Sequence, residues 1–251
     1  MASVAVLGLG NWGTAIARLW LLEGHKVKGW TIEQEVYESI TLRDVNEKYL
    51  PHHPVPGLDV TMRLDEALEG TEIVVLAVPS SVILDVVEDV IPHLQPRHVL
   101  LDLAKGLAPG KRLISEAIHT RLKEENKTNP LAVLTGPTIA PEAAGGVMTT
   151  ALVASEDQAI AQRLAQTLST TSFILHPASD PVGADSGERT KMSSLLPAAW
   201  STDSNKLVTL VETTSRLLFS CRVSKKGASC LPNWAPGPRL PLVQQDSVTC
   251  T

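Results

Sequence analysis

Short apolar runs alternate with amphipathic segments along the first 176 residues of the chain. Continuous apolar runs are typical of parallel strands buried on both faces, and apolar positions three or four apart indicate helices. The pattern predicts strands at 4–7, 26–30, 73–78, 99–104, 131–134, 151–154 and 173–175. It predicts helices at 14–22, 65–69, 82–90 (with Ser80 or Ser81 as N-cap), 112–123 and 156–168, and a looser helical pattern at 33–48. This alternation predicts an α/β fold with a doubly wound parallel sheet.

A glycine-rich turn joins the first strand to the first helix. Gly8, Gly10 and Gly13 have the spacing Gly-x-Gly-x-x-Gly. In a strand–turn–helix unit, the first glycine allows a tight turn, the second lets a pyrophosphate approach the backbone, and the third lets the helix pack closely. The N–H groups at the start of the helix then face an anion. The sequence therefore predicts a Rossmann-like dinucleotide-binding unit, with a plain structural turn as the alternative.

The end of the second predicted strand bears on the choice of cofactor. An acid there favours NAD, because it binds the adenosine ribose, whereas a basic residue accommodates the 2′-phosphate of NADP. The sequence places Glu33 three residues after Trp30. Glu33 either reaches the ribose or begins the next helix as a solvated acid. This pattern does not decide between NAD and NADP as the cofactor.

Two further turns follow predicted strands, at the edge of the sheet where α/β proteins bind ligands. Lys105 and Gly106 follow the strand at 99–104, which makes Lys105 a candidate ligand-binding cation rather than a solvated loop lysine. Gly136 and Thr138 follow the strand at 131–134. Backbone N–H groups and the Thr138 hydroxyl there offer donors for a phosphate or hydroxyl, unless the segment is an ordinary Gly-Pro turn.

Composition and charge narrow the class of protein. The chain has 251 residues, 43% of them apolar, and a net charge of −5, whereas a nucleic-acid-binding domain is typically basic. No apolar run reaches the roughly 18 residues of a membrane span. His52 and His53 have no acid or cysteine at metal-binding spacing, so we expect no metal site. We expect a cytoplasmic protein that binds a small molecule and neither nucleic acid nor a membrane.

Five spaced motifs resemble the NAD(P)-dependent glycerol-3-phosphate dehydrogenases. They are Gly-Leu-Gly-Asn-Trp-Gly-Thr at 8–14, Tyr-Leu-Pro at 49–51, Ala-Val-Pro-Ser at 77–80, Ala-Lys-Gly at 104–106 and Gly-Pro-Thr-Ile-Ala-Pro-Glu at 136–142. The match covers about residues 4–183. It implies a dinucleotide-binding domain, residues 1–180, followed by an all-helical substrate domain. It also implies an enzyme that interconverts sn-glycerol 3-phosphate and dihydroxyacetone phosphate with NAD or NADP, supplies phospholipid synthesis and forms a homodimer.

The resemblance also assigns site residues. The cofactor would bind at Gly8, Gly10, Asn11, Trp12, Gly13, Pro79, Lys105 and Ala140, and the substrate at Lys105, Gly136 and Thr138. Lys191 falls at the position of the family's catalytic lysine, and Ile32 stands where the family has a basic residue that recognises the 2′-phosphate. The alternatives are a cofactor-binding chain without catalysis and a related hydroxyacid or ketopantoate-type reductase.

The resemblance stops near Gly183. There the family continues with a catalytic lysine, an asparagine and an apolar helix, but here the asparagine and the apolar helix are missing. Codons allowed for residues 185–203, read one base earlier, can spell Leu-Gly-Gly-Ala-Tyr-Lys-Asn-Val-Ile-Ala-Leu-Ala-Gly-Gly-Val-Val-Asp-Gly, which is the family's pattern. Our hypothesis is a reading-frame slip near 183–185. Residues 181–251 are therefore interpreted as a degenerate or truncated remnant of the substrate domain, expected to be poorly ordered.

Overall fold

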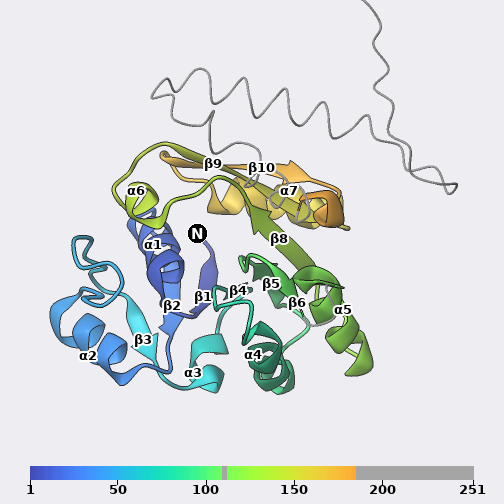
Figure 1. Ribbon diagram of the computed structural model, residues 1–251, viewed down its shortest axis with the longest axis horizontal. Coiled ribbons are helices and arrows are strands. Elements are labelled where there is room, and N and C mark those ends of the chain that lie inside the picture. Colours follow the sequence, from blue (N-terminus) through green and yellow to red (C-terminus); the bar gives the residue numbers. More distant parts are fainter. Residues whose placement is uncertain (109–111, 185–251) are drawn as a thin grey trace, which may run out of the picture. The chain divides into compact units, whose positions relative to one another are not determined.

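The computed structural model describes residues 1–108 and 112–184 (Figure 1). The strands are β1 (Ser3–Leu7), β2 (Lys26–Trp30), β3 (Asp59–Thr61), β4 (Ile73–Leu76), β5 (Val99–Asp102), β6 (Leu107–Ala108), β7 (Arg112–Leu113), β8 (Leu131–Thr135), β9 (Thr149–Ser155) and β10 (Phe173–Ala178). The helices are α1 (Asn11–Leu22), α2 (Gln34–Arg43), α3 (Leu64–Leu68), α4 (Ile83–Val90), the 3₁₀ turn η1 (Ile91–His93), α5 (Ile114–Glu124), α6 (Ala140–Ala144) and α7 (Gln158–Leu168).

Eight of the strands form one sheet in the order β10-β9-β8-β5-β4-β1-β2-β3, and β6 and β7 form a separate hairpin. Within this sheet β3, β2, β1, β4, β5 and β8 pair in parallel, in that order, and parallel pairing is what the sequence predicts. The chain order reverses at β1, so the loops after β1 and β4 stand at the place where such sheets bind ligands.

The predicted parallel sheet is confirmed for most of its strands, and the last two strands run in the opposite direction. β9 runs antiparallel to β8, and β10 then pairs in parallel with β9. The chain leaves β8 at the carboxyl edge of the sheet, and α6 packs beside α1. The chain does not cross a face of the sheet after α6. It therefore enters β9 at the same carboxyl edge, so β9 runs antiparallel to β8.

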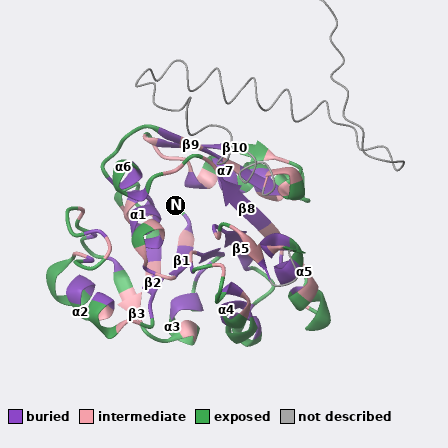
Figure 2. Cartoon of the chain, in the orientation of Figure 1, coloured by how far each residue is buried: buried purple, intermediate pink, exposed green. Residues whose placement is uncertain are grey.

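Residues of the central strands alternate between two apolar clusters, one on each face of the sheet. Val4 and Val6 of β1 pack with residues of α1, α2 and α7, whereas Ala5 and Leu7 pack with residues of α3, α4 and α5. Buried positions therefore line the strands and the inner sides of these helices (Figure 2). Helices on both faces explain why the strands read as continuous apolar runs.

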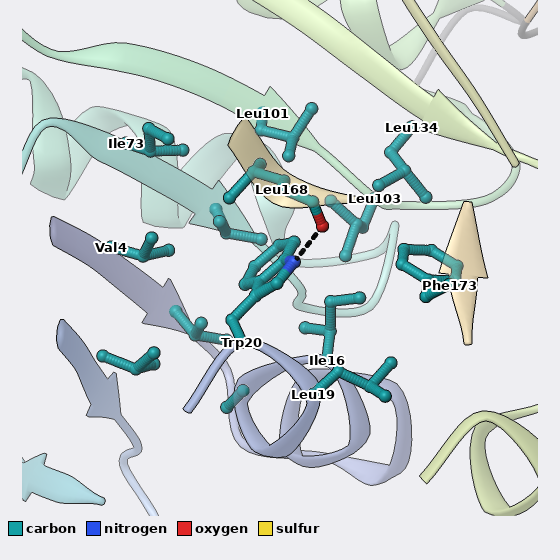
Figure 3. Close-up of a cluster of buried hydrophobic side chains, with 14 of the residues drawn as sticks. Val4, Ile16, Leu19, Trp20, Ile73, Leu101, Leu103, Leu134, Leu168 and Phe173 are labelled. Atoms are coloured by element: carbon teal, nitrogen blue, oxygen red, sulfur yellow. Dashed lines mark hydrogen bonds between the residues drawn. The ribbon is translucent and has the colours of Figure 1, made fainter. Parts of the chain in front are cut away.

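A buried tryptophan ties the first helix to the last crossover. The Trp20 side chain is fully buried and lies near Val4, Ile16 and Leu101 in the cluster of Figure 3. Its indole Nε1 donates a hydrogen bond to the Leu168 carbonyl oxygen at 2.9 Å (Figure 3). The end of α7 is thereby fixed against α1, the helix that follows the glycine-rich turn.

The serine cap predicted for the helix at 82–90 is wrong. α4 begins at Ile83 with Val82 as its N-cap, and no side chain caps it. The Val82 N–H donates to the Pro79 carbonyl oxygen at 3.1 Å, so the residues after β4 form a turn before the helix starts. The helix predicted at 112–123 likewise starts at Ile114, because residues 112–113 pair with β6 as β7.

Candidate functional site

The three glycines after β1 have three different environments. Gly8 has φ +100°, and a Cβ atom there would lie 2.7 Å from Val78 Cγ1. A Cβ atom on Gly13 would lie 1.8 Å from the Gly8 carbonyl oxygen, closer than any side chain allows. A Cβ atom on Gly10 would meet nothing within 4 Å. Gly8 and Gly13 are therefore required by the turn itself, whereas Gly10 borders open space.

The start of α1 offers unused donors beside that open space. Gly10 is the N-cap of this 12-residue helix, and its carbonyl oxygen accepts from the Thr14 N–H at 3.0 Å. No side chain in the described part of the chain caps the helix, and its first turn contains no acidic residue. The N–H groups of the first turn and the positive end of the helix dipole therefore favour an anion at this place.

A buried amide holds the glycine-rich turn in place. Asn46 Nδ2 donates to the Leu9 carbonyl oxygen and to Thr14 Oγ1, each at 2.8 Å, and Asn46 Oδ1 accepts from the Tyr49 N–H at 3.1 Å. Asn46 is fully buried. Sequence reasoning missed this residue, because it lies in an irregular segment 37 positions from Leu9 and belongs to no motif.

The turns after β1, β4 and β5 meet at the carboxyl edge of the sheet. A Cβ atom on Gly8 would lie 2.8 Å from the Ala77 carbonyl oxygen, and one on Gly106 would lie 3.3 Å from Ser80 Oγ. Pro79 and Lys105, both predicted site residues, are exposed on these turns. The predicted site residues on these three turns therefore lie at one edge of the sheet, where the strand order reverses at β1.

The segment after β8 completes this edge. β8 pairs in parallel with β5, so Gly136 and Thr138 follow at the same edge as Lys105. The Thr138 N–H donates to the Gly136 carbonyl oxygen at 2.9 Å, and a Cβ atom on Gly136 would lie 3.0 Å from the Ala151 Cα atom. Gly136 is thus needed for close packing on β9, whatever it binds.

A small apolar cluster brings Trp12 and Ala140, far apart in the chain, close together. Its members are Ala15, Leu50, Ala140 and Ala144, and Trp12 packs against them. The Trp12 ring also meets the Phe173 ring edge-on, with centroids 6.0 Å apart. Asn11 beside it is exposed. Lys191, the candidate catalytic lysine, lies outside the described residues.

Glu33 is the N-cap residue of α2, and its side chain is held from two sides. Lys48 Nζ donates to Glu33 Oε2 at 2.5 Å, and the Tyr49 hydroxyl donates to Glu33 Oε1 at 2.9 Å. Lys48 also pairs with Glu35. The Lys48 hydrogen bond is the main reason why the pKa of Glu33 is lowered, and the pKa of Lys48 is raised in turn. Glu33 thus stands at the start of α2, and its carboxylate is held by Lys48 and Tyr49.

The described residues contain neither a metal-binding cluster nor a membrane-spanning helix. Between residues 1 and 184, leaving out 109–111, no group of three or more His, Cys, Asp or Glu side chains is placed to hold a metal ion. None of the helices described has the length and apolar content needed to cross a membrane.

Comparison with known proteins then identifies the family. Residues 3–161 match the model of the NAD-dependent glycerol-3-phosphate dehydrogenase N-terminus. The chain belongs to this family. It is 33% identical over 193 residues to the glycerol-3-phosphate dehydrogenase [NAD(P)+] of Clostridium acetobutylicum, which covers 76% of this chain and 57% of the relative. The enzyme of the same name from Acidobacterium capsulatum is 37% identical over 193 residues, covering 74% and 57%.

A solved structure supports the same assignment. The glycerol-3-phosphate dehydrogenase of Coxiella burnetii superimposes with a TM-score of 0.69 at 27% identity, over 87% of this chain and 67% of that one. An imine reductase from Streptomyces aurantiacus, at 20% identity and a TM-score of 0.56, shares the fold alone. The chain spans little more than half the length of the curated family members it matches.

Proposed function

We propose that this chain binds NAD or NADP at the carboxyl edge of the sheet, with the pyrophosphate beside Gly10 at the start of α1. The observation that carries the proposal is the contrast among the three glycines. The turn leaves no room for a side chain at Gly8 or Gly13, whereas Gly10 borders open space next to uncapped N–H groups. A turn built only for packing would leave no reason for glycine at position 10. Trp12, Pro79, Lys105 and Ala140 are proposed as further cofactor contacts.

We infer that the reaction is the interconversion of sn-glycerol 3-phosphate and dihydroxyacetone phosphate, the reaction of the family. The bound nicotinamide would take or return the hydride on C2. Lys105, Gly136 and Thr138 follow neighbouring strands and are proposed to hold the substrate by its oxygen atoms. Lys191 is proposed to take and return the proton of the C2 hydroxyl, for which its amine must be neutral. The proposal divides the chain into a cofactor domain, 1–180, and a remnant of the substrate domain, 181–251.

The proposal includes a cytoplasmic location and a homodimer. The location is proposed as the default for a chain whose three cysteines are odd in number and suggest no disulfide framework. The dimer follows from the family resemblance. Light scattering after size-exclusion chromatography measures directly whether the protein is a dimer.

The departure from the family pattern after Gly183 favours a second candidate, in which the protein binds the cofactor but does not convert the substrate. The asparagine and the apolar helix that follow the family's catalytic lysine are missing after Lys191. Binding without turnover would be the result of keeping the first domain and losing the second.

The test is oxidation of NADH with dihydroxyacetone phosphate, followed by absorbance on the full chain. We expect turnover, and we expect Lys105→Ala to lower kcat/KM by about 100-fold, since charged groups at a reacting centre contribute effects of this size. Lys26→Ala is the matched control, because Lys26 is exposed at the opposite, amino-terminal edge of the sheet. NADH binding without turnover would select the second candidate, and absence of NADH binding would reject both.

A further inference from the structure

The backbone fixes Glu33 firmly at the end of β2. Thr31 is buried, and its N–H donates to the Thr61 carbonyl oxygen of β3 at 3.2 Å. The Glu33 N–H donates to Thr31 Oγ1 at 3.1 Å, and the Glu33 carbonyl oxygen accepts from the Val36 and Tyr37 N–H groups at 3.1 and 3.0 Å. The residue is therefore anchored on both its amide and its carbonyl side.

The Glu33 side chain is held by the same loop that holds the glycine-rich turn. Lys48 and Tyr49 contact the carboxylate, and the Tyr49 N–H donates to Asn46 Oδ1. Asn46 in turn contacts the Leu9 carbonyl oxygen inside the turn. A short path of hydrogen bonds thus connects the proposed pyrophosphate site with the carboxylate at the end of β2.

The charge around this carboxylate is negative. Glu33 and Glu35 share one cation, Lys48, so the three side chains carry a net charge of −1. Arg63, which follows β3 at the same edge, is already paired with Asp65 and Glu66.

Two exposed apolar side chains follow β2 and β3 at the edge of the sheet where Glu33 lies. Ile32 is 73% exposed and Met62 is 39% exposed. β2 pairs in parallel with β3, with Trp30 opposite Thr61, so these residues follow the two strands at the same edge. Exposed apolar side chains at this place suit the face of an adenine ring, which would cover them.

We propose that Glu33 selects NAD over NADP in this chain, its carboxylate accepting a hydrogen bond from a hydroxyl of the adenosine ribose. This rests on the proposed cofactor site. Lys48 and Tyr49 each occupy one position on the two carboxylate oxygens, and an ionised carboxylate has about four acceptor positions. Room for a ribose hydroxyl therefore remains. A 2′-phosphate would bring about two more negative charges against Glu33 and Glu35, and Lys48 would have to leave both carboxylates to meet it.

The experiment compares the dissociation constants of NADH and NADPH for the full chain, by isothermal titration calorimetry at fixed ionic strength. We expect NADH to bind at least tenfold more tightly than NADPH. Glu33→Gln keeps the shape of the side chain and removes its charge, and we expect it to weaken NADH binding and reduce the preference at least fivefold. Glu35→Gln is the matched control, because Glu35 shares Lys48 but lies in the first turn of α2. Because Glu35 adds to the negative charge but makes no contact with the ribose in this proposal, Glu35→Gln should reduce the preference by a smaller factor than Glu33→Gln does.

The outcomes separate this inference from the proposed function. Equal affinity for the two cofactors, tighter NADPH binding, or an unchanged preference in Glu33→Gln would overturn the role of Glu33 and leave the cofactor site standing. Binding of neither cofactor by the folded wild-type chain would overturn the cofactor site and the inference together. A change of equal size in Glu35→Gln would show a general effect of charge instead of a contact made by Glu33.

Discussion

At the scale of single residues, the glycine-rich turn separates two requirements that the sequence motif combines. Gly8 needs its positive φ and Gly13 needs its missing side chain for the turn to form at all. Gly10 has φ −72°, which any residue adopts, and open space in front of it. Folding therefore explains two of the glycines, and ligand binding is left to explain the third.

Substitution by alanine distinguishes these requirements. Gly13→Ala forces a Cβ atom against the Gly8 carbonyl oxygen, so we expect the free energy of unfolding to fall by about 3 kcal/mol, at the upper end of overpacking costs. Gly10→Ala should change it by less than about 1 kcal/mol. Urea denaturation followed by circular dichroism measures both. Equal losses in the two variants would contradict the assignment.

The partners of Glu33 and Thr14 mark the limit of sequence reasoning at this scale. Glu33 itself could be predicted as a candidate ribose-binding residue, because it lies only three residues after Trp30 at the end of the second predicted strand. Asn46 lies 37 positions from Leu9 and Lys48 lies 15 positions from Glu33, at the end of a segment with only a loose helical pattern. Such contacts are set by the tertiary path of a loop, for which the sequence carries no local pattern.

At the scale of elements, long apolar runs were predictable and short or edge elements were not. The strands at 4–7, 73–78 and 99–104 correspond to β1, β4 and β5, because burial on both faces leaves a continuous apolar signal. The strand at 26–30 corresponds to β2, although its sequence includes two lysines. β3 has three residues and α6 has five, too few to show a period. The reversal at β9 depends on where α6 packs, so strand prediction alone gives no information on direction.

The start of β5 supplies a pH-dependent prediction. His98 is fully buried, and its Nδ1 accepts from the Gln95 N–H at 3.1 Å. Burial, and secondarily the nearby Arg97 charge, lower its pKa below the ordinary value of 6.5. The unfolded chain therefore takes up a proton below about pH 6.5 that the folded chain excludes, and stability falls as the pH drops from 7 to 5.

We expect His98→Asn to reduce this loss by about 1 kcal/mol per pH unit, since the asparagine oxygen can accept from Gln95 but does not titrate. The measurement is the free energy of unfolding at several pH values between 5 and 7. The exposed His93 supplies the control His93→Gln, which should leave the pH dependence as in the wild type. An identical slope in His98→Asn and the wild type would refute the prediction.

At the scale of the whole molecule, the apolar clusters on the two faces of the sheet are formed within residues 1–184. The first cluster runs from Ala2 to Leu175 and the second from Ala5 to Leu122. Residues 185–251 lie outside the described part, and the hypothesis of a frame slip there stays a prediction that resequencing of the gene would test. The sequence predicts that these residues form no compact helical domain.

The division proposed at about residue 180 can be tested with a fragment. A fragment of residues 1–184 should fold alone, with a free energy of unfolding within about 1 kcal/mol of the main transition of the full chain, because it keeps every described member of both clusters. Limited proteolysis of the full chain should leave a fragment of about this size, since exposed loops are cut first. Aggregation or a loss of cooperative unfolding in the fragment would show that later residues contribute to the core.

The central claim is that the open space at Gly10 holds the pyrophosphate of a dinucleotide. The most direct test is the affinity of NADH for the full chain and for Gly10→Val, measured by calorimetry on protein whose thermal unfolding shows an intact fold. The branched side chain has room in the empty turn but would occupy the place of the phosphates. The account predicts a folded variant whose NADH affinity is reduced at least about 100-fold, beyond what loss of a single neutral hydrogen bond produces. A folded Gly10→Val chain that binds NADH as tightly as the wild type would contradict it.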